Sequence, residues 1–524
     1  MRSGPVSSVG FLAFLVSTVS LPAVDFFPDP IPKGPVALRL EEFARIPDSS
    51  PGQPPELNLM TGDPRGRLFV NDHNGPLYQV GPLGEVVVEY FDLRDYPELE
   101  LLNTKTERGF QSFAFHPGFF DPSSPGHGLL YTMHSSLDVS ETPDFDPGGS
   151  DVFHSVLLEW RTGRPEAVPF DPAEPETPYR EVLRLKQPGN WHNVGLIAFH
   201  PSARPGDPDY GGLYVGVGDG VTSGDPQGNG RNPANPYGAL LRIDPLGTNA
   251  ANGRYGIVEA NLLASDGDSG TLGEIFAFGL RNPQRFSWDR EAGRMFLSDI
   301  GENRVEELNR IVNGGNYGWN VKEGSFPFRS GDEVGLIDPV AEYDHTDPVA
   351  DMPTDIRRRA VTVGPVIRGF AHAGANGLLL FGDIVTGLVF TIDVDSDPLD
   401  GGQDGIRELD LIDAEGESVR LLEAINSERP RLGLSSVQRA DVRFGLETGS
   451  RLFVLNKHDG LVRRLVPVRP LRLEYEGGRL RVDFYGPLET SSDLERFTPL
   501  DPQPESPWIF GFGEGARFFR TTRP

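Results

Sequence analysis

The chain has 524 residues, a formal net charge of −28 at pH 7 and no cysteine. So acidic a protein repels the phosphate backbone, which argues against a nucleic-acid partner. The absence of cysteine excludes a disulfide framework and thiol chemistry. The 63 glycines and 48 prolines, with few long amphipathic runs, favour an all-β architecture of short strands and many turns.

The N-terminus has the features of an export signal. Arg2 precedes an apolar run from Val9 to Val24 that ends in small residues. This length and composition predict a secretory signal peptide over residues 1–24. No later stretch is apolar and long enough to span a membrane, so we expect a secreted or periplasmic protein.

One sequence phrase recurs along the chain: a turn rich in Gly, Pro and Asp, then a short aromatic-aliphatic strand that ends in Asp, Asn or Gly. Strand groups of this kind are each too small to bury their own faces. They therefore predict a six-bladed β-propeller over residues 37–466, with a β-sandwich of similar hairpins as the alternative. The six copies lie near Leu68, Leu130, Leu213, Met295, Leu380 and Leu452.

Two irregular insertions and a tail complete the chain. Residues 136–180 and 221–236 are polar and predict long loops on one face, where a propeller usually binds its ligand. The composition changes near Pro470, and Leu471 to Phe484 reads as a hairpin. Residues 470–524 are therefore predicted to form a small C-terminal β appendage.

A candidate acid–base pair follows from the third repeat. His192 directly precedes a predicted strand, and Asp219 ends the next strand. A histidine can act as a general base, and a nearby carboxylate can fix its tautomer and raise its basicity. The alternative is a hydrogen-bonded structural histidine, as expected for His116 and His200, which are each followed by proline.

Residues 271–321 hold the densest polar cluster. Arg281 and Asn282 stand where a strand breaks at Pro283, so their donors are expected at a strand end. A turn over residues 299–303, two glutamates and a glycine-rich corner follow. Concentrated carboxylates and turn carbonyls suit calcium, with a solvated acidic loop as the alternative.

Several motifs, in this order, resemble the soluble PQQ-dependent sugar dehydrogenases, the glucose/sorbosone dehydrogenase family. The resemblance covers about residues 37–466 and implies a six-bladed propeller that binds pyrroloquinoline quinone (PQQ) and calcium. It also implies oxidation of an aldose or related polyol, with electrons passed to an unidentified acceptor. The motifs are ERGFQSFAFHPGF, HNVGLIAFHP, LYVGVGDG, NPANPYGALLRIDP, EIFAFGLRNPQRFSWD, DIGENRVEELNRIVNGGNYGW and LLLFGDIVTGLVFTID.

The resemblance also implies roles for individual residues. His192 matches the base that removes the proton of the sugar C1 hydroxyl while hydride passes to the quinone. Arg281 and Asn282 match contacts to the quinone oxygens. Asp219 matches the family's GD turn, and Glu107 matches a polar cofactor contact.

The implied calcium ligands fall in two places. The carbonyls of Gly301 and Glu302 match the turn that holds the cofactor-bound calcium. Glu307 and Tyr317 match the ligands of a structural calcium site.

The chain departs from the family where cationic cofactor partners are expected. Val385 stands in place of a lysine, and Trp191 replaces a polar neighbour of the base. Arg439 and Arg443 are out of register with an expected arginine pair, which leaves Arg439 as a candidate cofactor contact. Two other functions therefore stay open: a non-catalytic, calcium-stabilised extracellular binding module, and a calcium-dependent lactone hydrolase with a metal-bound water.

Overall fold

The computed structural model describes residues 26–468 with seven short gaps, and the backbone of six strands in the C-terminal segment. The predicted signal peptide over residues 1–24 lies outside the described residues. The gaps are 105–106, 150–151, 222, 347–348, 350–358, 371 and 396–400.

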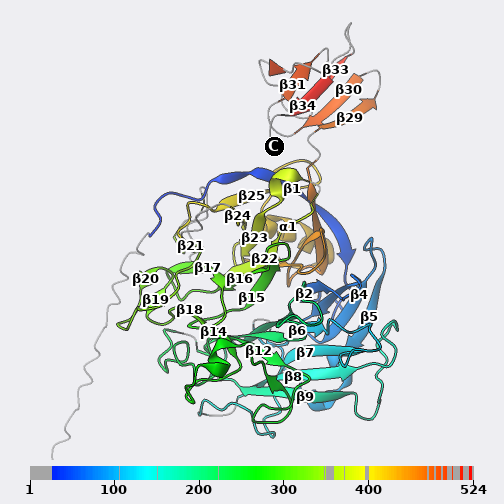
Figure 1. The fold of residues 1–524 in the computed structure, drawn as a ribbon. Helices are drawn as coiled ribbons and strands as arrows, with labels where there is room; N and C mark the ends of the chain where they lie inside the picture. The colour runs from blue at the N-terminus through cyan, green and yellow to red at the C-terminus, as the bar shows by residue number, and fades with distance from the viewer. Residues whose placement is uncertain are drawn as a thin grey trace, which may run out of the picture.

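Small antiparallel sheets follow one another around a centre, and the chain passes through them in order from the blue strands through the green to the orange ones (Figure 1). The first sheet contains β2 (Leu57–Gly62), β3 (Leu68–Asp72), β4 (Pro76–Val80) and β5 (Val87–Asp92). The second contains β6 (Phe110–Phe115), β7 (Leu129–Ser136), β8 (His154–Arg161) and β9 (Tyr179–Lys186).

The next two sheets contain the residues of most functional interest. The third is β10 (Val194–Phe199), β11 (Leu213–Val217), β12 (Ala239–Asp244) and β14 (Ile275–Phe278), extended by β18 (Gly315–Asn316) and by β13 (Gly256–Ile257) on β12. The fourth is β15 (Arg285–Asp289), β16 (Arg294–Asp299), β17 (Val305–Ile311) and β21 (Ala341–Asp344). A separate hairpin pairs β19 (Lys322–Glu323) with β20 (Phe326–Pro327).

The last sheet has eight strands, because the N-terminal strand β1 (Lys33–Arg45) pairs in parallel with β25 (Arg407–Ile412) and antiparallel with β28 (Leu461–Pro467). The described chain therefore shows a propeller-like arrangement of four separate sheets and one double-sized sheet, not the six separate blades predicted. Its strand order is β22 (Val361–Val366), β23 (Leu378–Asp383), β24 (Val389–Asp393), β25 (Arg407–Ile412), β1 (Lys33–Arg45), β28 (Leu461–Pro467), β27 (Leu452–Leu455) and β26 (Arg443–Phe444).

The inner strands form a ring. In this ring β2 neighbours β6, then β10, β15, β22 and β26 follow, and β26 returns to β2. An isolated bridge between Met60 and Gly445 joins the two ends of the series. Close contact between neighbours is evident at Gly195, where an added Cβ would lie 2.5 Å from the carbonyl oxygen of Gln284 on the next sheet.

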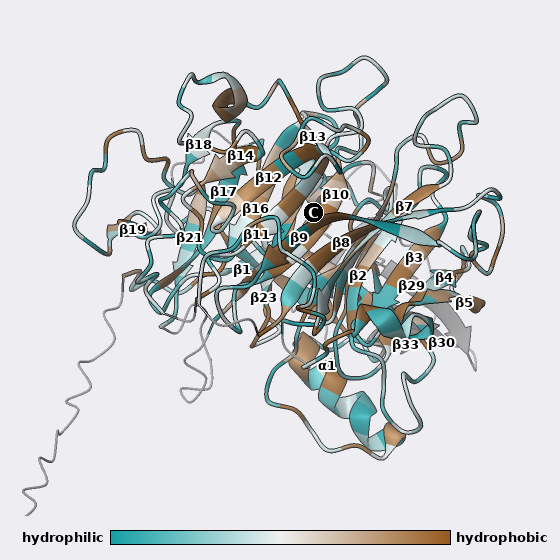
Figure 2. Cartoon of the chain, turned by 90° about the horizontal axis from the view of Figure 1, so that it is seen from below, coloured by the Kyte–Doolittle hydropathy of each residue, from teal (hydrophilic) through white to brown (hydrophobic). Residues whose placement is uncertain are grey.

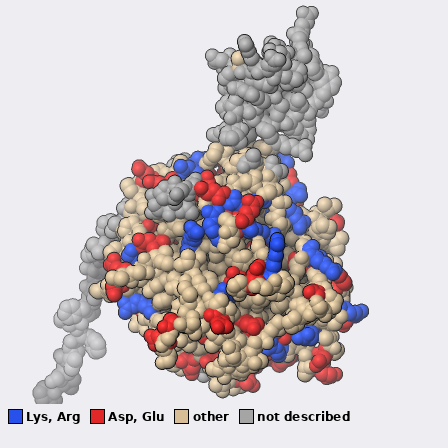
Figure 3. Space-filling model, in the orientation of Figure 1, with Lys and Arg blue, Asp and Glu red and all other residues tan. Residues whose placement is uncertain are grey.

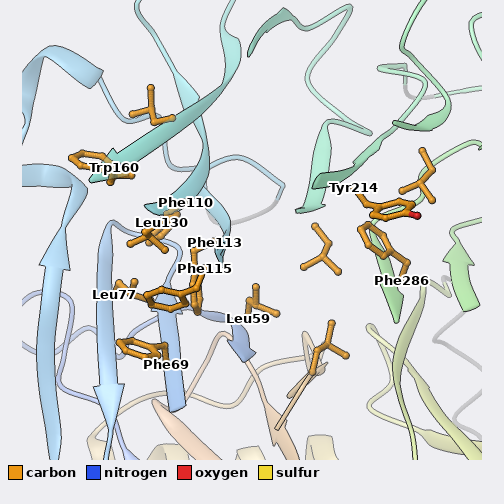
Figure 4. Close-up of a cluster of buried hydrophobic side chains, with 14 of the residues drawn as sticks. Leu59, Phe69, Leu77, Phe110, Phe113, Phe115, Leu130, Trp160, Tyr214 and Phe286 are labelled. Carbon is orange, nitrogen blue, oxygen red and sulfur yellow. The ribbon is translucent and has the colours of Figure 1, made fainter. Parts of the chain in front are cut away.

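Aromatic side chains fill the space between the sheets. Figure 4 shows Phe69, Phe113 and Phe115 gathered in one group, with Tyr214 and Phe286 in a second. The rings of Phe69 and Phe115 have centroids 4.7 Å apart, a favourable tilted contact. Hydrophobic colour is concentrated in the strands and hydrophilic colour in the loops (Figure 2). Burial on both faces accounts for the aromatic and aliphatic residues of the recurring strand phrase.

The remaining elements lie outside this ring. Helix α1 (Leu421–Glu428) buries Leu421 and Ile425. On the face drawn in Figure 3, acidic and basic side chains are interspersed, so the net negative charge does not form one continuous patch there. Within the described residues, no helix has the length and apolar character needed to cross a membrane.

The C-terminal segment contains two three-stranded sheets. The division of the chain into a propeller and a separate appendage remains a prediction. One sheet is β29 (Leu471–Glu476), β30 (Arg479–Phe484) and β33 (Trp508–Gly511), and the other is β32 (Thr498–Pro499), β31 (Leu488–Ser491) and β34 (Phe518–Thr521).

Candidate functional site

His192 and Asp219 lie side by side at the same end of neighbouring strands. His192 precedes β10 and Asp219 follows β11, and Nδ1 of the ring lies 2.7 Å from Oδ1 of the carboxylate. The backbone of His192 is left-handed, with φ of 52°. Its N–H donates to Oε2 of Glu107 at 2.6 Å, and its carbonyl accepts from the N–H of Gly220 at 3.1 Å. The ring is therefore held from both the side chain and the backbone.

The contacts of Asp219 define the tautomer of His192. Oδ2 of Asp219 accepts from Nε1 of Trp319 at 2.9 Å, and the N–H of Asp219 donates to the carbonyl of Arg281 at 2.8 Å. With its position fixed in this way, the carboxylate accepts the proton on Nδ1 of the neutral imidazole. Nε2 then carries the lone pair, and it makes no hydrogen bond to any described residue. It is available as a base.

Asp299 fixes the turn that contains Arg281 and Asn282. Its two carboxylate oxygens accept from the backbone N–H groups of Arg281 at 2.8 Å and Asn282 at 2.6 Å. Burial raises the pKa of Asp299 in spite of these two donors. The side-chain amide of Asn282 is 2% exposed and has no hydrogen-bond partner among the described residues. It is therefore free to bind a ligand.

Arg281 is occupied by contacts within the protein. Its Nη2 lies 2.8 Å from Oε2 of Glu302, and both side chains are buried. Its Nη1 donates to the carbonyls of Ile300 at 2.9 Å and Gly301 at 2.6 Å. Burial opposes ionisation of Glu302, but the charge of Arg281 lowers its pKa below the ordinary value. The guanidinium also lies 5.5 Å from the ring of Trp319.

This arrangement does not fit the calcium expected at the carbonyls of Gly301 and Glu302. The carbonyl of Gly301 already accepts from the Arg281 guanidinium, and a second cation there would be repelled by it. The carboxylate of Glu302, which could compensate, is bound to the same guanidinium. The predicted ligand carbonyl of Gly301 therefore holds the Arg281 guanidinium instead of calcium.

The second predicted calcium pair is not brought together. The carboxylate of Glu307 accepts from the N–H of Gly324 at 2.5 Å and from Nδ2 of Asn309 at 3.0 Å. The hydroxyl of Tyr317 donates to the carbonyl of Arg310 and accepts from the N–H of Val312. Residues 307 and 310 lie three positions apart on one strand, roughly 10 Å along the backbone, and the two groups share no hydrogen-bond partner in the described part of the chain. Among the described residues, no cluster of three His, Asp or Glu side chains is arranged for a metal.

Of the other two predicted cofactor contacts, one lies at the site and one does not. Glu107 lies at the site, where its carboxylate holds the backbone of His192. Arg439 points elsewhere, with Nε 2.8 Å from Oδ1 of Asp441 and a half-exposed side chain. Trp319 was missed as a site residue. Its buried indole N–H signals that an acceptor is needed, but not that the acceptor is Asp219.

A cavity lies at the other end of the inner strands. It has a volume of about 860 Å³, and its walls include Leu59, Phe113, Leu196 and Phe286. None of His192, Asp219 and Arg281 lines it. We place the chemistry at His192 and not in this cavity, because the paired and oriented acid–base groups lie at His192.

Comparison with known proteins identifies a family domain. Residues 181–352 match the Glucose / Sorbosone dehydrogenase family model. HIPL1 protein from Arabidopsis thaliana is 29% identical over 276 residues, which cover 46% of this chain and 38% of that protein. Hedgehog-interacting protein from Homo sapiens is 25% identical over 334 residues, which cover 63% of this chain and 40% of that protein. The chain thus spans less than half the length of these relatives.

The fold has counterparts among solved structures. The soluble aldose sugar dehydrogenase from Escherichia coli, in its apo form, superposes with a TM-score of 0.51 at 17% identity, covering 82% of this chain and 99% of that one. At this level of identity the likeness concerns the fold. The family resemblance drawn from the sequence motifs is confirmed over residues 181–352, which match the model of the glucose/sorbosone dehydrogenase family.

Proposed function

We propose that this protein oxidises an aldose or related polyol, with pyrroloquinoline quinone as its cofactor and His192 as the base. The observation that carries the proposal is the free Nε2 of His192 on a ring fixed by Asp219 and Glu107. In this proposal the eight-stranded sheet counts as two blades, so that the six inner strands belong to a six-bladed propeller. When bound, the quinone supplies the hydride acceptor.

The residues of the site have separate tasks. Nε2 of His192 takes the proton of the substrate hydroxyl, and Asp219 stabilises the imidazolium that results. Trp319 keeps the carboxylate of Asp219 in place through its indole N–H. The free amide of Asn282 provides a neutral donor for a ligand oxygen. These groups fit a hydroxyl-bearing substrate beside a polar cofactor.

Arg281 acts differently from the role that the resemblance implies. Because Glu302 and two turn carbonyls bind its guanidinium, it fixes the turn over residues 300–302 and adds positive potential beside Asn282. Glu107 is a positioning residue that acts through the backbone of His192. Arg439 has no role in the proposed mechanism, since its guanidinium binds Asp441.

Export and domain organisation belong to the same proposal. Residues 1–24 direct the protein to a secreted or periplasmic location, residues 37–466 carry the activity, and residues 470–524 form a small separate β unit. The electron acceptor is a second, unidentified partner.

Calcium is expected to have little effect on the protein as it stands, because Arg281 occupies the carbonyl of Gly301. Adding millimolar calcium to metal-free protein should shift Tm by less than about 1 °C, as expected when a ligand has no site in the folded state. Differential scanning calorimetry after exhaustive chelation measures this. A calcium-dependent rise in Tm would mean that Arg281 gives way to the ion, and the calcium-dependent form of the dehydrogenase would then replace this one.

The proposal is tested by titrating the purified protein with pyrroloquinoline quinone and then adding a panel of aldoses. Stoichiometric binding, followed by sugar-dependent bleaching of the quinone absorbance, is the expected result. Binding without reduction by any aldose or polyol would contradict the proposed substrate class. Absence of binding at micromolar quinone would contradict the proposed cofactor.

A binding module is the second candidate. It is favoured by the valine at position 385, where the family has a lysine, and by the relative named Hedgehog-interacting protein. In that case the His192–Asp219 pair would be structural, and the quinone titration would give no binding.

A further inference from the structure

Two buried guanidinium groups, from different sheets of the inner-strand ring, reach the same residue, Asn58. Arg285 begins β15 and Arg443 begins β26, and each is 3% exposed. Both reach Asn58 on β2: Nη2 of Arg285 lies 3.0 Å from its carbonyl oxygen, and Nε of Arg443 lies 3.4 Å from its Oδ1. Since β15 stands three places from β2 in the ring of six, the Arg285 side chain crosses the centre.

Neither guanidinium forms an ion pair with a carboxylate of the described residues. Apart from Asn58, Arg285 bonds only the adjacent carbonyl of Gln284 at 3.3 Å, and Arg443 bonds only the adjacent carbonyl of Val442 at 2.8 Å. The carboxylates nearby have other partners. Asp441 binds Arg439 and His458, and Glu107 binds the N–H of His192.

Two other buried arginines of the chain each have the carboxylate partner that Arg285 and Arg443 lack in the described part of the chain. Arg242 is 2% exposed and pairs with Asp209, and Arg463 is 6% exposed and lies 2.7 Å from Asp459. A charge removed from water is costly unless a partner of opposite sign accompanies it. Arg285 and Arg443 lack the carboxylate partner that Arg242 and Arg463 have among the described residues.

Further positive charge surrounds the pair. Burial and the charge of Arg443 lower the pKa of Lys457 to about 7, and burial lowers the pKa of Arg443 to about 10. Nζ of Lys457 lies 3.4 Å from Nδ1 of His73. Oε2 of Glu56 lies 3.7 Å from the same nitrogen of the His73 imidazole. A bound anion would relieve this like-charge repulsion.

We propose that Arg285 and Arg443 form a binding site for a small anion of the carboxylate or oxyanion class. Nε of Arg285 and Nη2 of Arg443 make no hydrogen bond to the described residues, so each side chain has a donor to offer. Guanidinium groups suit planar carboxylates because they present paired donors. The site does not depend on the proposed redox function. The bound anion is either a free organic or inorganic anion, or a carboxylate group of the quinone cofactor.

The test measures Tm of the full chain in a low-chloride buffer with and without added anion. Separate arms contain oxalate, inorganic phosphate and pyrroloquinoline quinone. At least one should raise Tm of the wild type by about 2 °C or more, as expected for a ligand of the folded state. Arg285→Gln and Arg443→Gln should lose that rise. Without anion they should be as stable as the wild type or more so, because the repulsion is gone.

Arg242→Gln is the matched control, since it removes a buried guanidinium that has a carboxylate partner. It should lower Tm but keep the response to anion. A response to oxalate or phosphate supports a free anion as the occupant, and a response to the quinone alone supports the cofactor. No response in any arm overturns the proposal, as does an equal response in the wild type and both variants. Quinone binding without sugar oxidation would contradict the proposed function but leave this site intact.

Discussion

Replacing His192 by alanine will lower quinone-dependent sugar oxidation by about 10²–10⁴-fold, the range that a positioned general base contributes. The cause is loss of the free Nε2, which is the only group of the fixed His192–Asp219 pair that can accept the hydroxyl proton. Quinone binding should change little, because the amide of Asn282 and the turn held by Asp299 are untouched. Dye-linked kcat/KM and the quinone absorbance titration measure the two effects separately.

His200→Ala is the matched control for this variant. His200 follows the other end of β10, where its ring lies 5.2 Å from that of Trp288, far from Asp219 along the strand. It should retain the activity of the wild type. The kcat/KM of Asp219→Asn should lie between those of His192→Ala and His200→Ala. In Asp219→Asn the imidazole remains, but it loses the carboxylate that stabilises its charged form. Unchanged turnover in His192→Ala would remove His192 from the mechanism.

The pairing of His192 with Asp219 could be foreseen from the sequence for a geometric reason. Antiparallel neighbours bring the start of one strand to the end of the next, so a residue before β10 and a residue after β11 must meet. The same reasoning placed Arg281 and Asn282 at the end of a sheet. Local strand order therefore predicts the contact between His192 and Asp219, whose roles remain a proposal.

Contacts between distant sheets could not be foreseen in this way. Asn58 meets Arg285 across 227 positions and Arg443 across 385 positions, and no local pattern records either contact. The sheet count differed for a similar reason, since β1 from the N-terminal part of the chain joins β25 and β28. The sequence also did not distinguish two possible partners of the turn over residues 300–302, a metal ion and an arginine. A run rich in carbonyls and carboxylates reads as a calcium site, but it serves equally well to bind the guanidinium of Arg281.

Replacing Arg281 by methionine is expected to cost about 3–5 kcal/mol of the free energy of unfolding, because it leaves Glu302 buried without its partner. Nη1 of Arg281 also satisfies the carbonyls of Ile300 and Gly301, and both would be left without that donor. Urea denaturation followed by tryptophan fluorescence measures the loss. The double variant Arg281→Met/Glu302→Met should recover part of it, since no unpaired charge is then buried.

An exposed ion pair provides the comparison that isolates burial as the cause. Arg164 pairs with Asp171 at 2.6 Å, much the same separation as Arg281 and Glu302, but its side chain is 71% exposed. Water already solvates both charges there, so Arg164→Met should cost less than about 1 kcal/mol. If the two single variants lose the same stability, desolvation is not what makes the Arg281–Glu302 pair important. The turn over residues 300–302 would then keep its shape without Arg281, and its carbonyls would again be available to a cation.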